Sequence, residues 1–202
     1  MVAAKQKKRG KINRPRTKFV VIGTEGRNKT EKIYFSQLFK QNSRYKPKFP
    51  TANETDPNDI VEATIRYIKN EEIDLADGDI AFCVIDTDTN PSKQVQIDKA
   101  LRMAKNNGIN LILSNPCFEI WFLQHFRYST GGLTNQEAIE ELETYLGKYE
   151  KNSSVYEAIA AKQEDAVKHA KKLEKYHNEL GRSPQSMQCN PSTEVYKIVE
   201  IN

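Results

Sequence analysis

The sequence has few cysteines and no long apolar run, and both shortages exclude classes of protein. The three cysteines, Cys83, Cys117 and Cys189, stand far apart and lack the C-x-x-C spacing of zinc sites, so neither a disulfide framework nor structural zinc is expected. No stretch approaches the roughly 18 apolar residues that a membrane helix needs. The charged amino terminus lacks the apolar segment of a secretory signal. We therefore expect a cytoplasmic protein that does not bind membranes.

The familiar nucleotide-binding loops are also absent. Residues 23–26, Gly-Thr-Glu-Gly, match neither the Walker loop nor the G-x-G-x-x-G pattern. Neither an ATPase nor a dinucleotide-binding enzyme is therefore expected from the sequence.

Positive charge is concentrated at one end of the chain. Residues 1–18 carry eight of the 31 Lys and Arg residues and no acid, which leaves a mildly acidic remainder with 23 basic and 27 acidic residues. Such an arm can bind nucleic-acid phosphates, or it can be a solubilising tail. On the first interpretation, the nucleic-acid-binding residues are Lys7, Lys8, Arg9, Lys11, Arg14, Arg16 and, beyond the arm, Arg27.

Short apolar runs alternate with amphipathic segments through residues 18–127. The runs at 18–23, 80–85 and 109–113 are typical of strands buried on both faces, and 46–51 is a weaker edge-strand candidate. This alternation predicts an α/β fold with a doubly wound, mostly parallel four-stranded sheet flanked by helices. The helix after the first strand is expected to start with a capping box formed by Asn28 and Glu31.

Residues 129–202 carry helix signals only. Thr134 and Glu137 have the spacing of a capping box, and a last helix is expected to begin near residues 190–192. The expected divisions are a basic disordered arm (1–17), an α/β core (18–128) and a helical appendage packed on that core (129–202).

Acidic residues follow three of the predicted strands, at the edge where open α/β sheets bind ligands. Glu25 follows the first strand, Asp86 and Asp88 follow the central one, and Glu119 heads the inward face of the apolar helix after the last. Asp86 and Asp88 are two apart, so an extended chain would point both to the same side. Oxygen ligands in this number suit one or two Mg²⁺ or Mn²⁺ ions, which could support phosphodiester cleavage.

Each candidate also has an ordinary explanation. An acid after a strand often caps a helix or forms a turn, and D-x-D loops are common. Lys29 and Arg27 flank Glu25 and could steady a phosphate, but surface charge explains them equally. His125 lies one helical turn after Trp121 and fits a packed core histidine better than a catalytic one. Only the joint placement of the acids indicates a site.

Several motifs together resemble the RloB-like family. They are Glu25-Gly26 with Lys29-Thr30-Glu31, Asp86-Thr87-Asp88, residues 114–121 (SNPCFEIW) and residues 190–193 (NPST). The resemblance covers roughly residues 17–202. It implies a Toprim-like fold, in which a Glu after the first strand and a D-x-D after a later one bind metal.

The resemblance assigns roles to particular residues. Glu25, Asp86 and Asp88 match the metal-binding positions, and Glu119 lies in the family's own motif. Three residues, 27–29, separate Gly26 from Thr30, one more than the usual spacing, so the supporting roles of Lys29 and Glu31 stay open. The family also implies bacterial antiphage defence by abortive infection, often with a partner ATPase.

Two functions are consistent with these observations. The first is a Mg²⁺- or Mn²⁺-dependent nuclease that acts on DNA or RNA, including tRNA, with Glu25, Asp86, Asp88 and Glu119 as its catalytic residues. In it Glu119 is a further metal ligand or the base that orients water. The second is a non-catalytic adaptor or nucleic-acid-binding module that works with a partner ATPase. A homo-oligomer, formed through an edge strand or through helices, is compatible with either.

Overall fold

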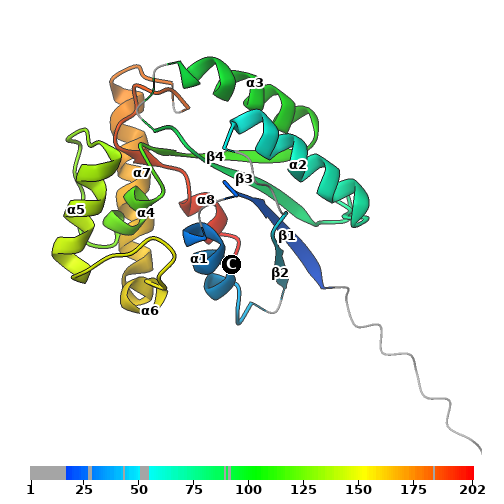
Figure 1. Ribbon diagram of the computed structural model, residues 1–202, viewed down its shortest axis with the longest axis horizontal. Helices are drawn as coiled ribbons and strands as arrows, with labels where there is room; N and C mark the ends of the chain where they lie inside the picture. The colour runs from blue at the N-terminus through cyan, green and yellow to red at the C-terminus, as the bar shows by residue number, and fades with distance from the viewer. Residues whose placement is uncertain are drawn as a thin grey trace, which may run out of the picture.

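The computed structural model describes residues 17–26, 29–42, 44–50, 55–88, 90, 92–183 and 185–202. They form a sheet with helices on both faces (Figure 1). No helix within these ranges is long and apolar enough to cross a membrane.

The sheet has five strands in the order β2-β1-β3-β4-β5 (Figure 1). The first four pair in parallel, whereas β5 is antiparallel to β4. The expected α/β fold with a mostly parallel sheet is confirmed. The strand bounds are β1 Lys18–Gly23, β2 Tyr45–Lys48, β3 Ile80–Asp86, β4 Ile109–Asn115 and β5 Ser192–Thr193.

The fifth strand corrects two predictions, namely four strands and only helix signals after residue 129. β5 has two residues, which is too short to show the alternation that marks a strand in a sequence. It pairs Thr193 with Ser114 of β4, and the two hydroxyl oxygens lie 3.0 Å apart. A segment far along the chain thus completes the sheet next to a buried parallel strand.

The helices cover the two faces of the sheet unequally. In Figure 1, α2 and α3 lie together on one face, while α1, α4, α7 and α8 lie toward the other. The helix bounds are α1 Thr30–Leu38, α2 Pro57–Asn70, α3 Lys93–Asn106, α4 Glu119–Gln124, α5 Asn135–Leu146, α6 Tyr156–Ile159, the 3₁₀ turn η1 Ala160–Lys162, α7 Gln163–Glu179 and α8 Tyr196–Val199.

Successive strand residues alternate between two apolar clusters. In β1, Val20 and Ile22 join the cluster with α1, α4, α5, α7 and α8, whereas Val21 joins the cluster with α2 and α3. The same alternation runs through β3, where Phe82 and Cys83 belong to different clusters. Both faces of the sheet are therefore buried, which explains the unbroken apolar runs in the sequence.

Two helix starts show where local signals hold and where they fail. Thr134 and Glu137 form the expected capping box of α5. α1 instead begins after Lys29, which makes no side-chain capping bond, and Glu31 is only 3% exposed. The capping box expected from Asn28 and Glu31 needs α1 to begin one residue earlier, since Glu31 is the second residue of the helix rather than the third, and Asn28 itself lies outside the described residues. The Glu31 carboxylate lies instead near other buried acids.

Candidate cation site at the carboxyl edge of the sheet

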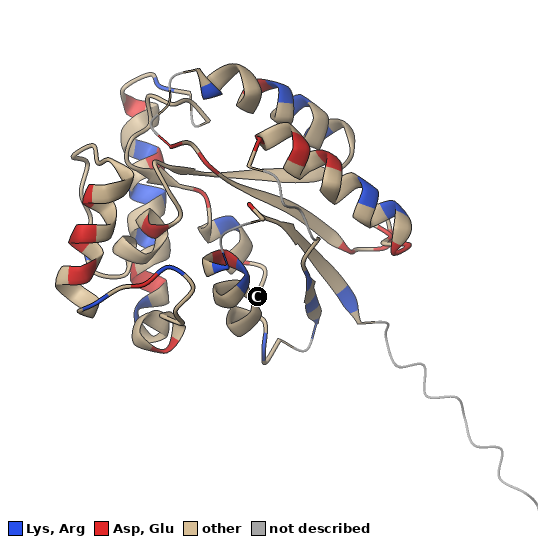
Figure 2. Cartoon of the chain, in the orientation of Figure 1, with Lys and Arg blue, Asp and Glu red and all other residues tan. Residues whose placement is uncertain are grey.

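The carboxyl ends of β1, β3 and β4 lie side by side because these strands are parallel neighbours. Glu25 lies two residues beyond β1, Asp86 ends β3, and Glu119 opens α4 a few residues after β4. Figure 2 shows acidic positions at the carboxyl ends of β1 and β3. The topology thus brings the acids expected at three strand ends to one edge.

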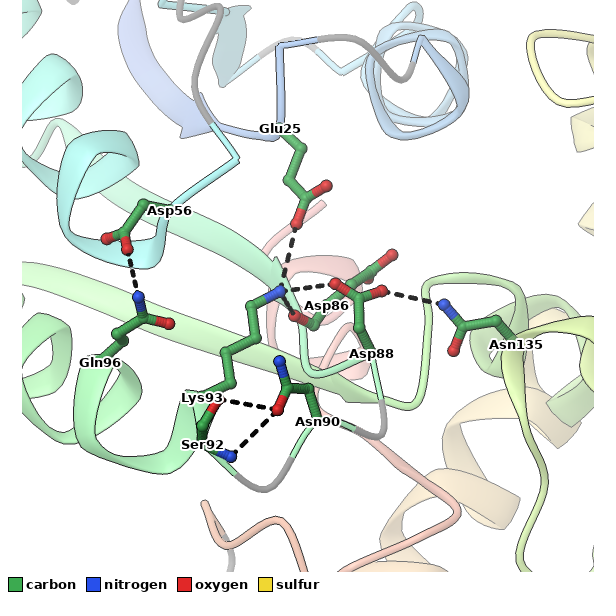
Figure 3. Close-up of polar contacts among 9 residues, drawn as sticks. All are labelled: Glu25, Asp56, Asp86, Asp88, Asn90, Ser92, Lys93, Gln96 and Asn135. Carbon is green, nitrogen blue, oxygen red and sulfur yellow. Dashed lines mark hydrogen bonds and ion pairs between the residues drawn. The ribbon is translucent and has the colours of Figure 1, made fainter.

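Lys93 occupies the centre of the outer part of this site (Figure 3). Its ammonium group donates to a side-chain oxygen of Asp88 and to the backbone carbonyl of Asp86, both at 2.7 Å, and lies 3.8 Å from Glu25 Oε1. Asp88 also accepts a hydrogen bond from the side-chain amide of Asn135, at 2.9 Å. One lysine therefore bridges the ends of β1 and β3.

The chain turns sharply between the two aspartates. Asp88 has a φ of 56°, a left-handed conformation that Asp tolerates better than most residues, so the extended geometry expected through residues 86–88 is wrong. The backbone N–H of Asp88 donates to the carbonyl of Pro116 at 3.0 Å. This turn leaves Asp88 partly exposed beside Lys93, whereas Asp86 is buried.

A second, deeper group of acids consists of Asp86, Glu31 and Glu119. They are 5%, 3% and 2% exposed. Burial raises the pKa of Asp86 well above its usual value, and the neighbouring charges of Glu31 and Glu119 raise it further. Burial likewise raises the pKa of Glu31 to about 8. Charge repulsion thus couples carboxylates from α1, β3 and α4.

Several oxygens in this region have no hydrogen-bond partner within the described part of the chain. They include one carboxylate oxygen each of Glu25, Glu31 and Asp86, as well as the hydroxyls of Thr24 and Thr87. A buried polar atom without a partner costs roughly 1–3 kcal/mol, and a charged one costs more. Such atoms clustered at one edge could accept hydrogen bonds from water or coordinate an ion.

The segment between α5 and α6 covers the deeper acids. The hydroxyl of Tyr149 donates to Glu119 Oε1 at 3.0 Å. Asn152 accepts from the backbone N–H of Lys29 at 2.9 Å, at the start of α1. Between them lies Lys151: burial lowers its pKa, but the negative charges around it, chiefly those of Glu119 and Asp86, together raise the pKa above its usual value. Residues distant in the sequence therefore form one wall of the site.

The sequence also predicted site residues that are basic rather than acidic. The ring Nδ1 of His125 lies 3.0 Å from the carbonyl of Trp121, in its own helix. Burial lowers the pKa of His125 to about 4, so the imidazole is neutral at physiological pH. For Lys29, the structure gives a backbone contact with Asn152. The residues assigned to nucleic acid, Lys7, Lys8, Arg9, Lys11, Arg14, Arg16 and Arg27, lie outside the described ranges.

Sequence reasoning missed Lys93, Tyr149 and Asn135. For Lys93 a signal existed: it opens α3, where the helix dipole disfavours a cation. A lysine in the first turn of a helix that follows an acid pair therefore calls for another explanation. Tyr149 and Asn135 offered no such signal, because their contacts span 30 and 47 residues.

The donor set fits a hard divalent cation, since it consists of carboxylate oxygens with unused lone pairs. Within the described ranges, no three acid, His or Cys side chains already stand in a metal-binding arrangement. The outer acids, Glu25 and Asp88, form ion pairs with Lys93 instead. An open pocket of about 250 Å³ leads from solvent to Asp88 and Lys93; its lining also includes Asp56, Asn90 and Gln96.

Comparison with known proteins gives one match. The sequence model of the RloB-like protein family matches residues 20–201, nearly the whole chain. No curated protein and no solved structure matches the chain.

Proposed function

Because the chain belongs to the RloB-like family, we propose that its acidic edge is the active site of a Mg²⁺- or Mn²⁺-dependent nuclease. One observation carries the proposal. Five carboxylates, Glu25, Glu31, Asp86, Asp88 and Glu119, gather at the carboxyl edge of a parallel sheet and repel one another, and three of them have buried oxygens without a partner. A divalent cation would relieve both the repulsion and the unmet hydrogen bonding.

In this proposal Glu25, Asp86 and Asp88 hold the cation. A bound Mg²⁺ or Mn²⁺ would make water more acidic and stabilise charge on a leaving phosphate oxygen. Glu119 is a further ligand or the base that orients the attacking water. Tyr149 restricts the Glu119 carboxylate by donating a hydrogen bond to one of its oxygens.

The finer fold assignment is also a proposal. A Toprim-like fold is supported by the strand order, by the glutamate that follows β1 and by the D-x-D that begins at the last residue of β3.

The family resemblance supports a role in bacterial antiphage defence by abortive infection, in the cytoplasm, with a partner ATPase. The substrate would be DNA or RNA, with tRNA as one candidate.

The decisive experiment is cleavage of plasmid DNA and total bacterial RNA by the purified chain with Mg²⁺, Mn²⁺ or a chelator. Asp86→Asn keeps the size and neutral form of a buried carboxyl group, so the fold is retained. We expect its activity to fall by more than the roughly 10- to 100-fold that changes outside the metal's ligand shell cause. The matched control is Asp165→Asn, which removes an exposed acid on α7.

Cleavage by the wild type and by Asp165→Asn, but not by Asp86→Asn, would support the proposed nuclease activity and identify its substrate. Equal cleavage by Asp86→Asn would refute the assignment of the site. If no protein cleaves, even with a partner ATPase added, the adaptor function replaces the nuclease. In that case phage protection would survive Asp86→Asn but not removal of residues 1–16.

A further inference from the structure

Lys93 lies at the start of its helix, where the helix dipole disfavours a positive charge. It is the first residue of α3, next to the positive end of the helix dipole. It is also buried, with 8% of its surface exposed. Neither helix formation nor solvation therefore explains its position, and the explanation must come from the oxygens that it contacts.

Those oxygens resemble the ligands of a metal ion. The Lys93 ammonium group contacts one carbonyl oxygen and one carboxylate oxygen at 2.7 Å, with a second carboxylate at 3.8 Å. They come from the ends of β1 and β3, namely Glu25, Asp86 and Asp88. Hard cations select clustered carboxylate and carbonyl oxygens of this kind. The same three residues are the cation ligands of the proposed function.

The Lys93 ammonium group also has an adjoining pocket into which it can move. Its side chain has four rotatable bonds. It lines the open pocket of about 250 Å³, whose lining also includes Asp56 and Asn90. Asp56 offers the ammonium a carboxylate there: its Oδ2 accepts a hydrogen bond from the neutral amide of Gln96 at 2.7 Å, while its Oδ1 accepts from Asn58.

We propose that Lys93 is the resident counter-ion of this site: it neutralises Glu25 and Asp88 in the cation-free protein, and a divalent cation binds by displacing its ammonium group into the adjoining pocket. The inference rests on the cation site of the proposed function but not on cleavage. The protein then avoids an uncompensated acid pair when no metal is bound, and metal affinity is set partly by the strength of the Lys93 contacts.

The test is Mn²⁺ binding by titration calorimetry on the full chain, in wild type, Lys93→Met and Lys168→Met. Lys168 is an exposed lysine on α7, so its variant has the same net charge without touching the site. Removing a competing cation should tighten Mn²⁺ binding by roughly tenfold in Lys93→Met, equivalent to about 1.4 kcal/mol. Lys168→Met should bind as the wild type does.

A second measurement needs no variant. An amine-reactive reagent followed by peptide mass spectrometry reports the accessibility of each lysine. Buried Lys93 should label slowly in chelator and faster when Mn²⁺ is added, while exposed Lys168 should label equally in both. Labelling of Lys93 that does not change with bound Mn²⁺ would overturn the proposal, even if Lys93→Met failed to fold.

The outcomes separate the two proposals. Equal or weaker Mn²⁺ binding by Lys93→Met, with normal binding by the wild type, refutes displacement but leaves the cation site intact. Absence of Mn²⁺ binding in both proteins refutes the cation site and the displacement together. Tighter binding by Lys93→Met without any nuclease activity would support displacement while the cleavage proposal fails.

Discussion

At the scale of single residues, the buried acids carry an electrostatic cost that exposed acids avoid. Glu31 is buried, and its pKa is raised to about 8 because burial, and then the charges of Glu119 and Glu25, disfavour ionisation. The folded protein consequently binds more protons than the unfolded chain between about pH 4.5 and pH 8.

This proton uptake predicts how stability depends on pH. In chelator, the free energy of unfolding should fall as pH rises from 5 to 8, by an amount on the order of a few kcal/mol. Glu31→Gln cannot ionise and should flatten that dependence, as measured by urea denaturation at both pH values. Glu164→Gln, which alters an exposed acid on α7, should keep the wild-type slope. A Glu31→Gln slope equal to that of the wild type would contradict the burial argument.

Tyr149 offers a second test at this scale. It is 6% exposed, and its hydroxyl donates to the buried Glu119. Tyr149→Phe removes that donor and leaves the carboxylate short of a partner, so we expect unfolding to become easier by about 2 kcal/mol. Tyr145→Phe, at a 43% exposed position, should change stability by less than about 0.5 kcal/mol. Equal effects of the two changes in denaturant titrations would refute the role of Tyr149.

At the scale of elements, the site depends on how closely α2 lies against the end of β1. Gly23 is the last residue of β1, and a Cβ atom there would collide with the hydroxyl of Thr64 on α2 and meet Cys83 at 3.3 Å. The hydroxyl of Thr64 donates to the carbonyl of Ile60, so it is held in place. Glycine thus lets the strand end next to the helix, two residues before Glu25.

We expect Gly23→Ala to destabilise the protein by about 2–3 kcal/mol through this overlap. Adding Thr64→Ala should recover part of the loss, so that the two changes are coupled by more than about 0.5 kcal/mol in a double-mutant cycle. Gly131→Ala is the control, because a Cβ atom there comes no closer than 3.7 Å to its nearest neighbour. Strict additivity of Gly23→Ala and Thr64→Ala would show that the overlap is not the cause.

At the scale of the whole molecule, one apolar core joins the sheet to the C-terminal helices. Trp121 of α4 is fully buried in a cluster that also contains Leu142 of α5 and Ala170 of α7. The edge of β4 is closed from the same part of the chain, since Glu194 accepts the backbone N–H of Leu113 at 3.0 Å. Removing these segments would expose both the core and a sheet edge.

A fragment of residues 17–128 should therefore not fold by itself. Circular dichroism should show no cooperative unfolding for it, whereas the full chain should unfold in one transition that is the same by circular dichroism and by fluorescence of its single tryptophan, Trp121. A cooperative transition of the isolated fragment would show that the core does not require the C-terminal helices.

The sequence by itself determined the α/β pattern and the position of four acids relative to it. The apolar runs of β1, β3 and β4 are long enough to show burial on both faces. Once parallel strands are inferred, the residues that follow them must lie at one edge. Glu25 and Asp86 could thus be placed together from local patterns and one topological rule.

Only the tertiary structure decided the contacts that complete the site. Glu31 looked like a capping residue but lies among buried acids, β5 was too short to show a pattern, and Tyr149 reaches Glu119 across 30 residues. Periodicity and capping signals report interactions within a few residues of each other. Which distant side chains meet is set by the packing of helices on the sheet, and that packing places Lys93 between the ends of β1 and β3.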